Sequence, residues 1–331
     1  MSGRTLVIGG AGFVGGWLTR ALAEDGVEVD VLDDLSRGVR DRFLEDLEAR
    51  PNVRVISGSI LDPATTDALG DGYARIYHLA AILGVQMVRD RPYDTLTLNN
   101  GMLVAALELA KRQKALERFV FSSTSEVYAG TLIHHGLDFP TPEDTPLSIA
   151  PMEEPRTSYM LSKIYGEMLC LHAGVPATVV RPHNFYGPRM GLAHVAPQML
   201  QRAHQASDGD EFAVYSADHQ RTFCYVDDAV RLLRALAEAD GAEGGVFNIG
   251  AEEPELTIEA FARLVVDTVG RDLTLVPEPA TPGSPLRRCP SMAKTTGVTG
   301  MRAEIDPAEG LRRTYAWYRD HVFAEGGVSA V

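Results

Sequence analysis

A tyrosine and a lysine four residues apart are a pair that could move a proton. They are Tyr159 and Lys163, in the run Thr-Ser-Tyr-Met-Leu-Ser-Lys. On a helix, side chains at positions i and i+4 share one face. A free phenol has a pKa of about 10 and is a poor base at neutral pH. A neighbouring ammonium group favours the phenolate, so this spacing is typical of a tyrosine that acts as a base.

Four hydroxyls and one acid follow a short apolar strand in the middle of the chain. Residues 118–121 read Arg-Phe-Val-Phe, and residues 122–128 read Ser-Ser-Thr-Ser-Glu-Val-Tyr. Ligands bind at the carboxyl ends of strands in open α/β sheets. Ser122, Thr124 and Glu126 are therefore candidate site residues. A polar turn capped by Ser or Thr is the alternative explanation.

A glycine-rich turn near the start of the chain is the element that would position these groups. The apolar run 6–8 predicts a buried strand, and residues with helical spacing follow the glycines at 9, 10, 12 and 15. Glycine allows a tight turn and lets a pyrophosphate approach the N–H groups at the helix start. The glycines fit two spacings, Gly10-x-Gly12-x-x-Gly15 and Gly9-x-x-Gly12-x-x-Gly15. The turn therefore predicts a dinucleotide site.

An acidic residue ends the second strand of this unit. The strand covers residues 27–32 and stops at Asp33. A carboxylate there can accept hydrogen bonds from the adenosine ribose and repels a 2′-phosphate. The sequence thus favours NAD over NADP, a preference that Arg37 weakens. His78, at another strand end, is better explained by hydrogen bonds to the backbone than by catalysis.

Strands and helices alternate along the rest of the chain. We expect an α/β fold, a Rossmann doubly wound parallel sheet with a smaller α/β C-terminal substrate-binding domain. The NAD-binding domain is expected over 1–181, with 221–250 returning to it, and the substrate region over 182–331. Further strands are expected at 53–58, 75–81, 175–182, 211–215, 245–249 and 273–277. Helices are expected at 41–50, 99–115, 157–173, 195–206, 229–239, 257–269 and 307–321, and a loop at 130–157.

Composition narrows the class of protein. The chain has 331 residues, of which 45% are hydrophobic and 23% charged, as in a globular enzyme. A net charge of −14 argues against nucleic acid and membrane surfaces as partners. Cys170, Cys224 and Cys289 lie far apart in no metal-ligand spacing, which predicts reduced thiols, no metal and a cytoplasmic protein. The first strand starts next to Met1 and leaves no room for a signal peptide.

Together these motifs resemble those of extended short-chain dehydrogenases/reductases, and more narrowly the NAD-dependent nucleotide-sugar epimerase/dehydratase family. The resemblance covers essentially the whole chain, and the motifs keep the family's order. It implies a tightly held NAD that is regenerated in each turnover, a UDP-sugar substrate and a homodimer. The matching segments are 9–15, 33, 122–128, 159–163, 181–189, 221–228 and 245–250.

The resemblance also implies roles for single residues. Tyr159 would take the proton of the sugar 4-hydroxyl, Lys163 would hold the nicotinamide ribose and lower the pKa of Tyr159, and Thr124 would hydrogen-bond the 4-oxygen. For Arg221 and Arg288, which would bind the diphosphate or the acid group of the sugar, surface ion pairs are the alternative explanation. The expected cofactor contacts are Gly9, Gly12, Phe13, Val14, Gly15, Asp33, Ser36, Arg37, Ser59, Ile60, Leu79, Ala80, Ala81, Asn99, Ser122, Tyr159, Lys163 and Pro182. The expected substrate contacts are Thr124, Ser125, Asn184, Arg189, Tyr215, Arg221 and Arg288.

Three reactions can follow oxidation at C4, and the residues of this chain favour them to different degrees. Dehydratases of the family have Thr-Asp-Glu where this chain has Thr-Ser-Glu at 124–126, which disfavours 4,6-dehydration. Decarboxylation needs a C6 carboxylate β to the new ketone. Thr-Ser-Glu and the segment 287–291 resemble the UDP-glucuronate decarboxylases, and Glu126 would favour loss of CO₂ by charge repulsion.

Epimerisation needs only oxidation, rotation of the keto sugar and return of the hydride. Residues 189–195 resemble a generic epimerase loop. We therefore expect a UDP-glucuronate 4-epimerase in which Thr124, Glu126, Tyr159 and Lys163 are catalytic, with a UDP-glucuronate decarboxylase as the close alternative. A non-catalytic NAD sensor is a further alternative, against which the intact threonine, tyrosine and lysine argue.

Overall fold

The protein is organised around a seven-stranded parallel sheet with the strand order β11-β6-β5-β4-β1-β2-β3. A computed structural model describes residues 3–281 and 283–324. This strand order is that of a doubly wound Rossmann sheet with one added strand, and it confirms the predicted fold class. The strands are β1 (Arg4–Ile8), β2 (Val29–Asp33), β3 (Val53–Ser57), β4 (Tyr73–His78), β5 (Arg118–Ser122), β6 (Ala177–Pro182) and β11 (Val246–Ile249).

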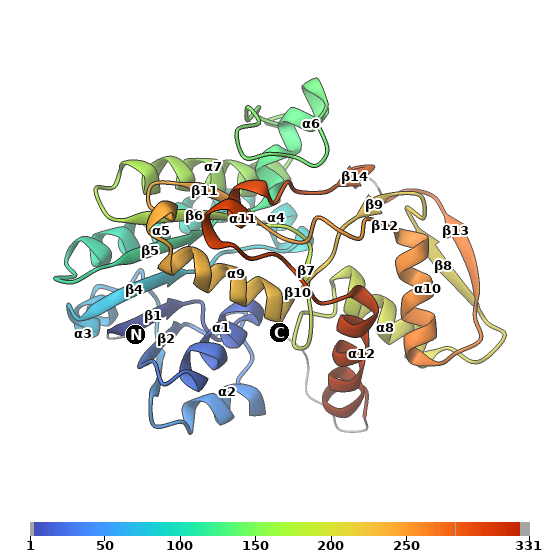
Figure 1. The fold of residues 1–331 in the computed structure, drawn as a ribbon, viewed down its shortest axis with the longest axis horizontal. Helices are drawn as coiled ribbons and strands as arrows, with labels where there is room; N and C mark the ends of the chain where they lie inside the picture. Colours follow the sequence, from blue (N-terminus) through green and yellow to red (C-terminus); the bar gives the residue numbers. More distant parts are fainter. Residues whose placement is uncertain (1–2, 282, 325–331) are drawn as a thin grey trace.

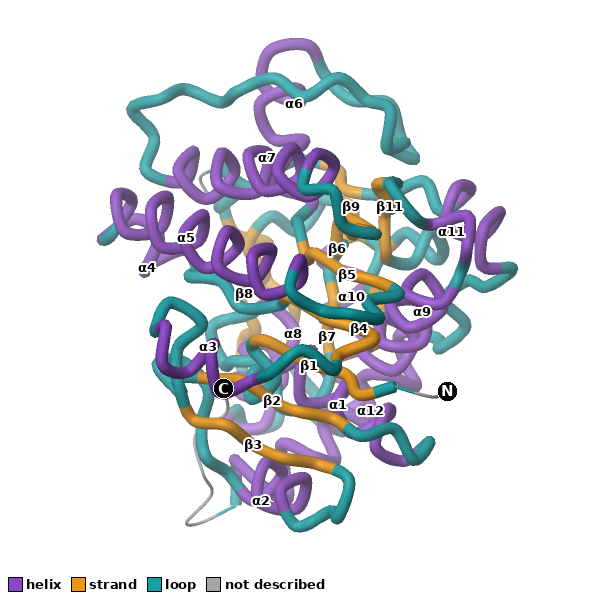
Figure 2. Tube along the Cα trace, turned by 90° about the vertical axis from the view of Figure 1, so that its left-hand side faces the viewer, coloured by secondary structure: helices purple, strands orange, loops and turns teal. Residues whose placement is uncertain are grey.

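Helices cover both faces of the sheet, because successive side chains of a buried strand point to opposite sides. In β1, Val7 belongs to one hydrophobic core, whereas Leu6 and Ile8 belong to the other. Figure 2 shows two of the covering helices on one side of the strands and two on the other. The first pair is α5 (Pro92–Lys111) with α7 (Arg156–His172), and the second is α1 (Phe13–Glu24) with α9 (Val226–Glu238).

After β6 the chain builds a smaller region beside the sheet, on the right of Figure 1. It contains α8 (Val195–Gln205), α10 (Ile258–Val269), α12 (Pro307–Tyr318) and the parallel pair β8 (Glu211–Tyr215) and β13 (Thr274–Glu278). Two-residue strands join the region to the sheet edge. They are β7 (Phe185–Tyr186) with β10 (Cys224–Tyr225), and β9 (Gln220–Arg221) between β12 (Leu256–Thr257) and β14 (Arg287–Arg288).

Several elements differ from those expected. The long helix α5 begins at Pro92, seven residues before Asn99, because a proline suits the first helical position. The segment expected as a loop contains a short helix, α6 (Ala129–His135), which protrudes in Figure 1. No helix of the described residues is long and apolar enough to cross a membrane. The remaining α-helices are α2 (Arg42–Glu48), α3 (Pro63–Leu69), α4 (Val85–Asp90) and α11 (Ala293–Thr299). There are also two short 3₁₀ helices, η1 (Ser125–Tyr128) and η2 (Asp240–Ala242), and a short π-helix, η3 (Arg319–Phe323).

Candidate active site

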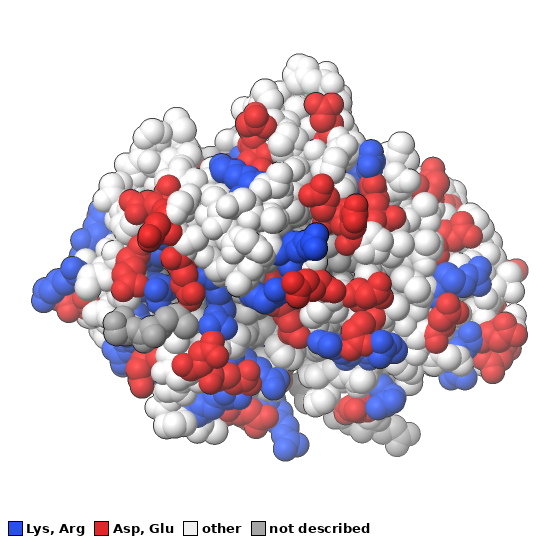
Figure 3. All heavy atoms as spheres, viewed as in Figure 1, with Lys and Arg blue, Asp and Glu red and all other residues white. Residues whose placement is uncertain are grey.

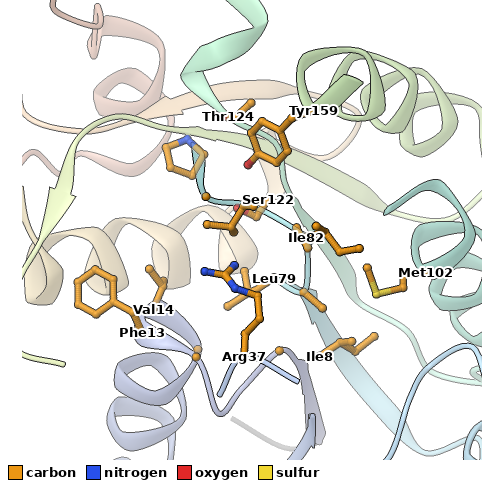
Figure 4. A pocket seen from close by; sticks show the side chains of 18 of the residues that line it. Ile8, Phe13, Val14, Arg37, Leu79, Ile82, Met102, Ser122, Thr124 and Tyr159 are labelled. Carbon is orange, nitrogen blue, oxygen red and sulfur yellow. The ribbon is translucent and has the colours of Figure 1, made fainter. Parts of the chain in front are cut away.

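A cavity of about 740 Å³ lies over the carboxyl ends of the sheet strands. This volume is in the range of small-molecule sites, and the position is where open α/β sheets bind ligands. Its wall combines the glycine turn, the end of β5, the start of α7 and the strand β14. Figure 4 shows Tyr159 and Thr124 on one side of the cavity and Phe13, Val14 and Arg37 on the other.

The glycine turn forms a cradle that only residues without a side chain can build. Gly9 has φ +85°, and a Cβ on it would lie 2.7 Å from the Ala80 nitrogen. A Cβ on Gly15 would lie 2.2 Å from the carbonyl oxygen of Gly9. Gly12 precedes α1, and no side chain of the described residues caps this helix. The N–H groups at the start of α1 therefore face the cavity, and this geometry fits the pyrophosphate of NAD.

Asp33 is fixed at the rim of the cavity by two backbone groups. Its carboxylate accepts hydrogen bonds from the Ala11 nitrogen at 3.0 Å and from the Leu35 nitrogen at 2.9 Å. Burial raises the pKa of Asp33, although these two hydrogen bonds act in the opposite direction. Arg37 projects into the cavity from the side opposite Tyr159. The carboxylate thus stands at the end of β2, where the adenosine ribose of a dinucleotide is expected.

Tyr159 and Lys163 lie on one face of α7, but the lysine does not act on the tyrosine as the sequence suggested. The Lys163 Nζ donates to the carbonyl oxygen of Ser122 at 2.7 Å and lies 5.8 Å from the centroid of the Tyr159 ring. Burial lowers the pKa of Lys163 to about 8. Burial raises the pKa of Tyr159 to about 12, and the charge of Glu126 acts in the same direction, whereas hydrogen bonding with Thr124 and the charge of Arg37 act against it. Desolvation of the phenol therefore outweighs the charge of Arg37 in this structure.

Glu126 lies between two arginines on the wall of the cavity. One carboxylate oxygen accepts a hydrogen bond from Arg288 at 2.7 Å, and the other accepts one from Arg156 at 3.1 Å. Burial acts to raise the pKa of Glu126, but the charges of Arg288 and Arg156 outweigh it and hold that pKa below its ordinary value. The backbone nitrogen of Glu126 donates to the Thr124 hydroxyl at 3.2 Å. The acid is therefore ionised and tied to the threonine beside Tyr159.

The cavity has a local charge opposite to that of the whole protein. Acidic and basic side chains lie interspersed on the face shown in Figure 3. Among the described residues, four arginines line the cavity against three acids, so that one positive charge is in excess. An anionic substrate thus meets a cationic site in an acidic chain. The arginines are Arg37, Arg91, Arg156 and Arg288, and the acids are Asp33, Asp34 and Glu126.

Most of the residues expected at the site line this one cavity. Asn99 and Lys163 do not line it but hold its wall, since the Asn99 side chain accepts a hydrogen bond from the Ile82 nitrogen at 2.7 Å. The residues that do line it are Gly9, Gly12, Phe13, Val14, Gly15, Asp33, Ser36, Arg37, Ser59, Ile60, Leu79, Ala80, Ala81, Ser122, Thr124, Ser125, Glu126, Tyr159, Pro182, Asn184 and Arg288.

Three residues expected to contact substrate lie away from the cavity. Arg189 is fully buried and pairs with Asp41, with its Nε 2.7 Å from a carboxylate oxygen. Arg221 is also buried, and it donates to the Gln220 carbonyl oxygen at 2.7 Å and to the Ser284 hydroxyl at 3.0 Å. Tyr215 is 53% exposed on β8. Arg189 and Arg221 stabilise loops in this structure. Their positions do not support the expectation that they bind substrate.

The structure adds residues that the sequence analysis did not identify. Arg156 lines the cavity and precedes Tyr159 by three residues, so both lie on the same face of α7. That spacing was a usable signal. His194, Met102 and Ile82 also line the cavity, but they come from three separate elements, and only the fold brings them together.

Comparison with known proteins gives consistent matches over the chain. The sequence model of the NAD dependent epimerase/dehydratase family matches residues 5–250. The chain is 31% identical to UDP-N-acetyl-alpha-D-glucosaminuronate decarboxylase of Bacillus cytotoxicus over 97% of this chain and 99% of that protein. It is 32% identical to UDP-glucuronic acid decarboxylase 1 of Xenopus tropicalis, over 96% and 72% of the two chains. UDP-glucose 4-epimerase of Thermotoga maritima has a similar structure, with a TM-score of 0.80, 27% identity and coverage of 96% and 99%.

Proposed function

The chain belongs to the NAD-dependent epimerase/dehydratase family, and we propose that it is a decarboxylase of a UDP-linked uronic acid, with UDP-glucuronate or its 2-acetamido analogue as the substrate. Two of the relatives named above are decarboxylases of such sugars. They favour decarboxylation over the 4-epimerisation that the sequence analysis preferred. The prediction of NAD as the cofactor agrees with the family, and the glycine cradle and Asp33 fit it.

One observation carries the proposal: Glu126 and Arg288 form a hydrogen-bonded ion pair on the cavity wall, next to Thr124. A decarboxylase must bind a carboxylate on the reacting carbon, and a guanidinium does this with good geometry. Dehydration would need a second acid beside the threonine, and Ser125 occupies that place. The site therefore supplies a cation, Arg288, for a C6 carboxylate. Where dehydration would need the second acid, between Thr124 and Glu126, the chain has the hydroxyl of Ser125.

The residues of this chain divide the chemistry between them. When bound, NAD supplies a positively charged ring that accepts a hydride from C4 and can return it. Tyr159, once ionised, takes the proton of the 4-hydroxyl, while the Thr124 hydroxyl hydrogen-bonds the same oxygen. The product of this oxidation is a β-keto acid. Its C5–C6 bond breaks, CO₂ leaves, and the electron pair of that bond passes to the C4 carbonyl as an enolate until C5 takes up a proton.

Glu126 and Lys163 assist these chemical steps in different ways. The ionised Glu126 repels the substrate carboxylate more strongly than it repels neutral CO₂, which raises the energy of the ground state relative to the product. Lys163 fixes the carbonyl oxygen of Ser122 in the cavity wall. We propose that it also holds the nicotinamide ribose when NAD is bound. We propose that residues 1–181, with 221–250, bind the cofactor and that the rest of 182–331 binds the nucleotide sugar.

A 4-epimerase acting on UDP-glucuronate is the second candidate. Met190, Gly191 and His194 line the cavity and belong to the segment that resembles an epimerase loop. The structural similarity to UDP-glucose 4-epimerase of Thermotoga maritima agrees with it.

Mass spectrometry of the nucleotide sugar separates the two candidates. The NAD-loaded protein is incubated with UDP-glucuronate or with its 2-acetamido analogue, and Tyr159→Phe serves as the inactive control. The proposal expects a product lighter by CO₂, either a UDP-pentose or its 4-ketone. A product of unchanged mass with an inverted 4-hydroxyl would establish the epimerase instead. No loss of CO₂ from either uronate would refute the decarboxylase.

A further inference from the structure

Glu126 has two cationic partners, and they are not equivalent. Arg156 is the first residue of α7, so its charge adds to the positive end of that helix dipole. Arg288 belongs to β14 and is paired in register with Arg221 of β9. Burial lowers the pKa of Arg221 to about 10, and the charge of Arg288 acts in the same direction, which means that the two guanidinium groups repel one another. The negative charge of Glu126 beside Arg288 offsets part of this repulsion, because it raises the pKa of Arg221.

Arg288 has spare capacity to bind a second anion. Its neighbour Arg287 is committed elsewhere, because it donates twice to Glu255, each time at 2.7 Å. Arg221 spends its donors on Ser284 and on backbone carbonyl oxygens. Among the described residues, Arg288 makes a side-chain hydrogen bond to Glu126 alone. Arg288 lines the cavity, and among the described residues most N–H groups of its guanidinium have no partner.

Arg156 makes the corresponding single bond to the other oxygen of Glu126. Because each arginine takes one oxygen, either can leave while the other still holds the carboxylate. The Arg156 side chain is 38% exposed and that of Arg288 is 23% exposed. Glu126, Arg156 and Arg288 together have a net charge of +1, which one substrate carboxylate would neutralise.

We propose that Arg156 is a positioning residue that holds Glu126 in place while Arg288 exchanges this glutamate for the carboxylate of the sugar. Glu126 is then the internal counter-ion of Arg288 in the substrate-free enzyme. A neutral hexose cannot take part in the exchange, so the device selects uronates. This inference rests on the proposed function, since it assumes a substrate with a C6 carboxylate.

A double-mutant cycle between Arg156 and Glu126 tests the exchange. Binding of UDP-glucuronate and of UDP-glucose is measured by calorimetry on NAD-loaded protein, with Tyr159→Phe as the background so that no turnover occurs. In Arg156→Met, Glu126 stays on Arg288 and competes with the substrate. We expect UDP-glucuronate to bind about tenfold more weakly, the size of one lost charged hydrogen bond. UDP-glucose should bind as before.

The same substitution should have little effect once Glu126 has lost its charge. In the Glu126→Gln background, Arg156→Met is expected to change the affinity for UDP-glucuronate by about twofold or less. Arg156→Lys should restore most of the affinity. Arg288→Met should remove the preference for the uronate altogether. Arg42→Met is the matched control, because Arg42 is an exposed arginine at the first position of another helix, α2.

Distinct results would overturn the inference. An equal loss in both backgrounds would mean that Arg156 contacts the substrate itself, and an equal loss for both nucleotide sugars would mean a structural role. A wild-type holoenzyme that releases no CO₂ would refute the proposed function instead. The coupling is scored on binding alone, so the two failures remain distinguishable. Thermal melting of each variant shows that it is folded.

Discussion

Replacing Arg189 by methionine should destabilise the fold while leaving the substrate contacts of the cavity in place. The sequence suggested a substrate ligand, but this guanidinium is fully buried. Two of its nitrogens lie 2.7 and 3.1 Å from the carboxylate oxygens of Asp41. It also donates to the carbonyl oxygens of Gly12 at 3.0 Å and of Val39 at 3.3 Å. Arg189 thus ties three loops together under the glycine cradle.

The expected loss in the free energy of unfolding follows from the charge of Asp41, which Arg189→Met leaves without its partner. Removing one partner of a buried ion pair costs about 3–5 kcal/mol, because the other charge is left uncompensated. Asp41 keeps one hydrogen bond, since it caps α2 by accepting from the Leu44 nitrogen at 3.0 Å. We therefore expect the lower end of that range, about 3 kcal/mol. The pair between Arg287 and Glu255 is partly exposed, so Arg287→Met should lower the free energy of unfolding by about 1 kcal/mol or less.

Urea denaturation of the NAD-free protein measures both substitutions, and a titration with NAD measures the cofactor site. Arg189→Met should also bind NAD more weakly, because the carbonyl oxygens of Gly12 and Val39 lose their common anchor. Adding Asp41→Asn to Arg189→Met should restore part of the stability, since the unpaired charge disappears. If Arg189→Met were as stable as the wild type and affected only the binding of the sugar nucleotide, the structural role assigned to Arg189 would be wrong.

Three further predictions concern the cofactor cradle and a buried histidine. A methyl group on Gly15 would meet the Gly9 carbonyl oxygen at 2.2 Å, so Gly15→Ala should abolish NAD binding in calorimetry, whereas Gly297→Ala, with open space around it, should not. Asp33→Ala should shift the ratio of NADP to NAD affinity upward, and an unchanged ratio would contradict the role of its charge. Burial lowers the pKa of His78 to about 3, so the unfolded chain binds the extra proton below about pH 6.5 and stability falls as the pH falls. Between about pH 7 and 5, the free energy of unfolding measured in urea should fall by about 2 kcal/mol less in His78→Gln than in the wild type. An identical fall in both proteins would contradict this.

Features set by local sequence were predicted correctly. The unit from the first strand to Asp33 follows from apolar runs and from glycines that a tight turn requires, and the structure places the turn and the acid at one cavity. The face shared by Tyr159 and Lys163 follows from helical geometry alone. The start of α5 was missed because Asn99 is of a residue type that is common at helix N-caps, although Pro92 is also a helix-start signal.

Features set by distant contacts could not be read from the sequence. Arg189 and Asp41 are 148 residues apart, and nothing local distinguishes a buried arginine from one that binds substrate. The contact between Glu126 and Arg288 spans 162 residues. The pKa of Tyr159 is set mainly by how deeply the phenol is buried. The lysine that the spacing places beside it donates instead to the carbonyl oxygen of Ser122.

The fate of the substrate's carboxyl carbon tests the central claim most directly. UDP-glucuronate and its 2-acetamido analogue, each labelled with carbon-13 at C6, are added to the NAD-loaded wild-type protein and followed by carbon NMR. The account predicts that the label of at least one of them leaves the nucleotide sugar and appears as CO₂ and bicarbonate. A label that stays in the carboxylate of a sugar with an inverted 4-hydroxyl would contradict it.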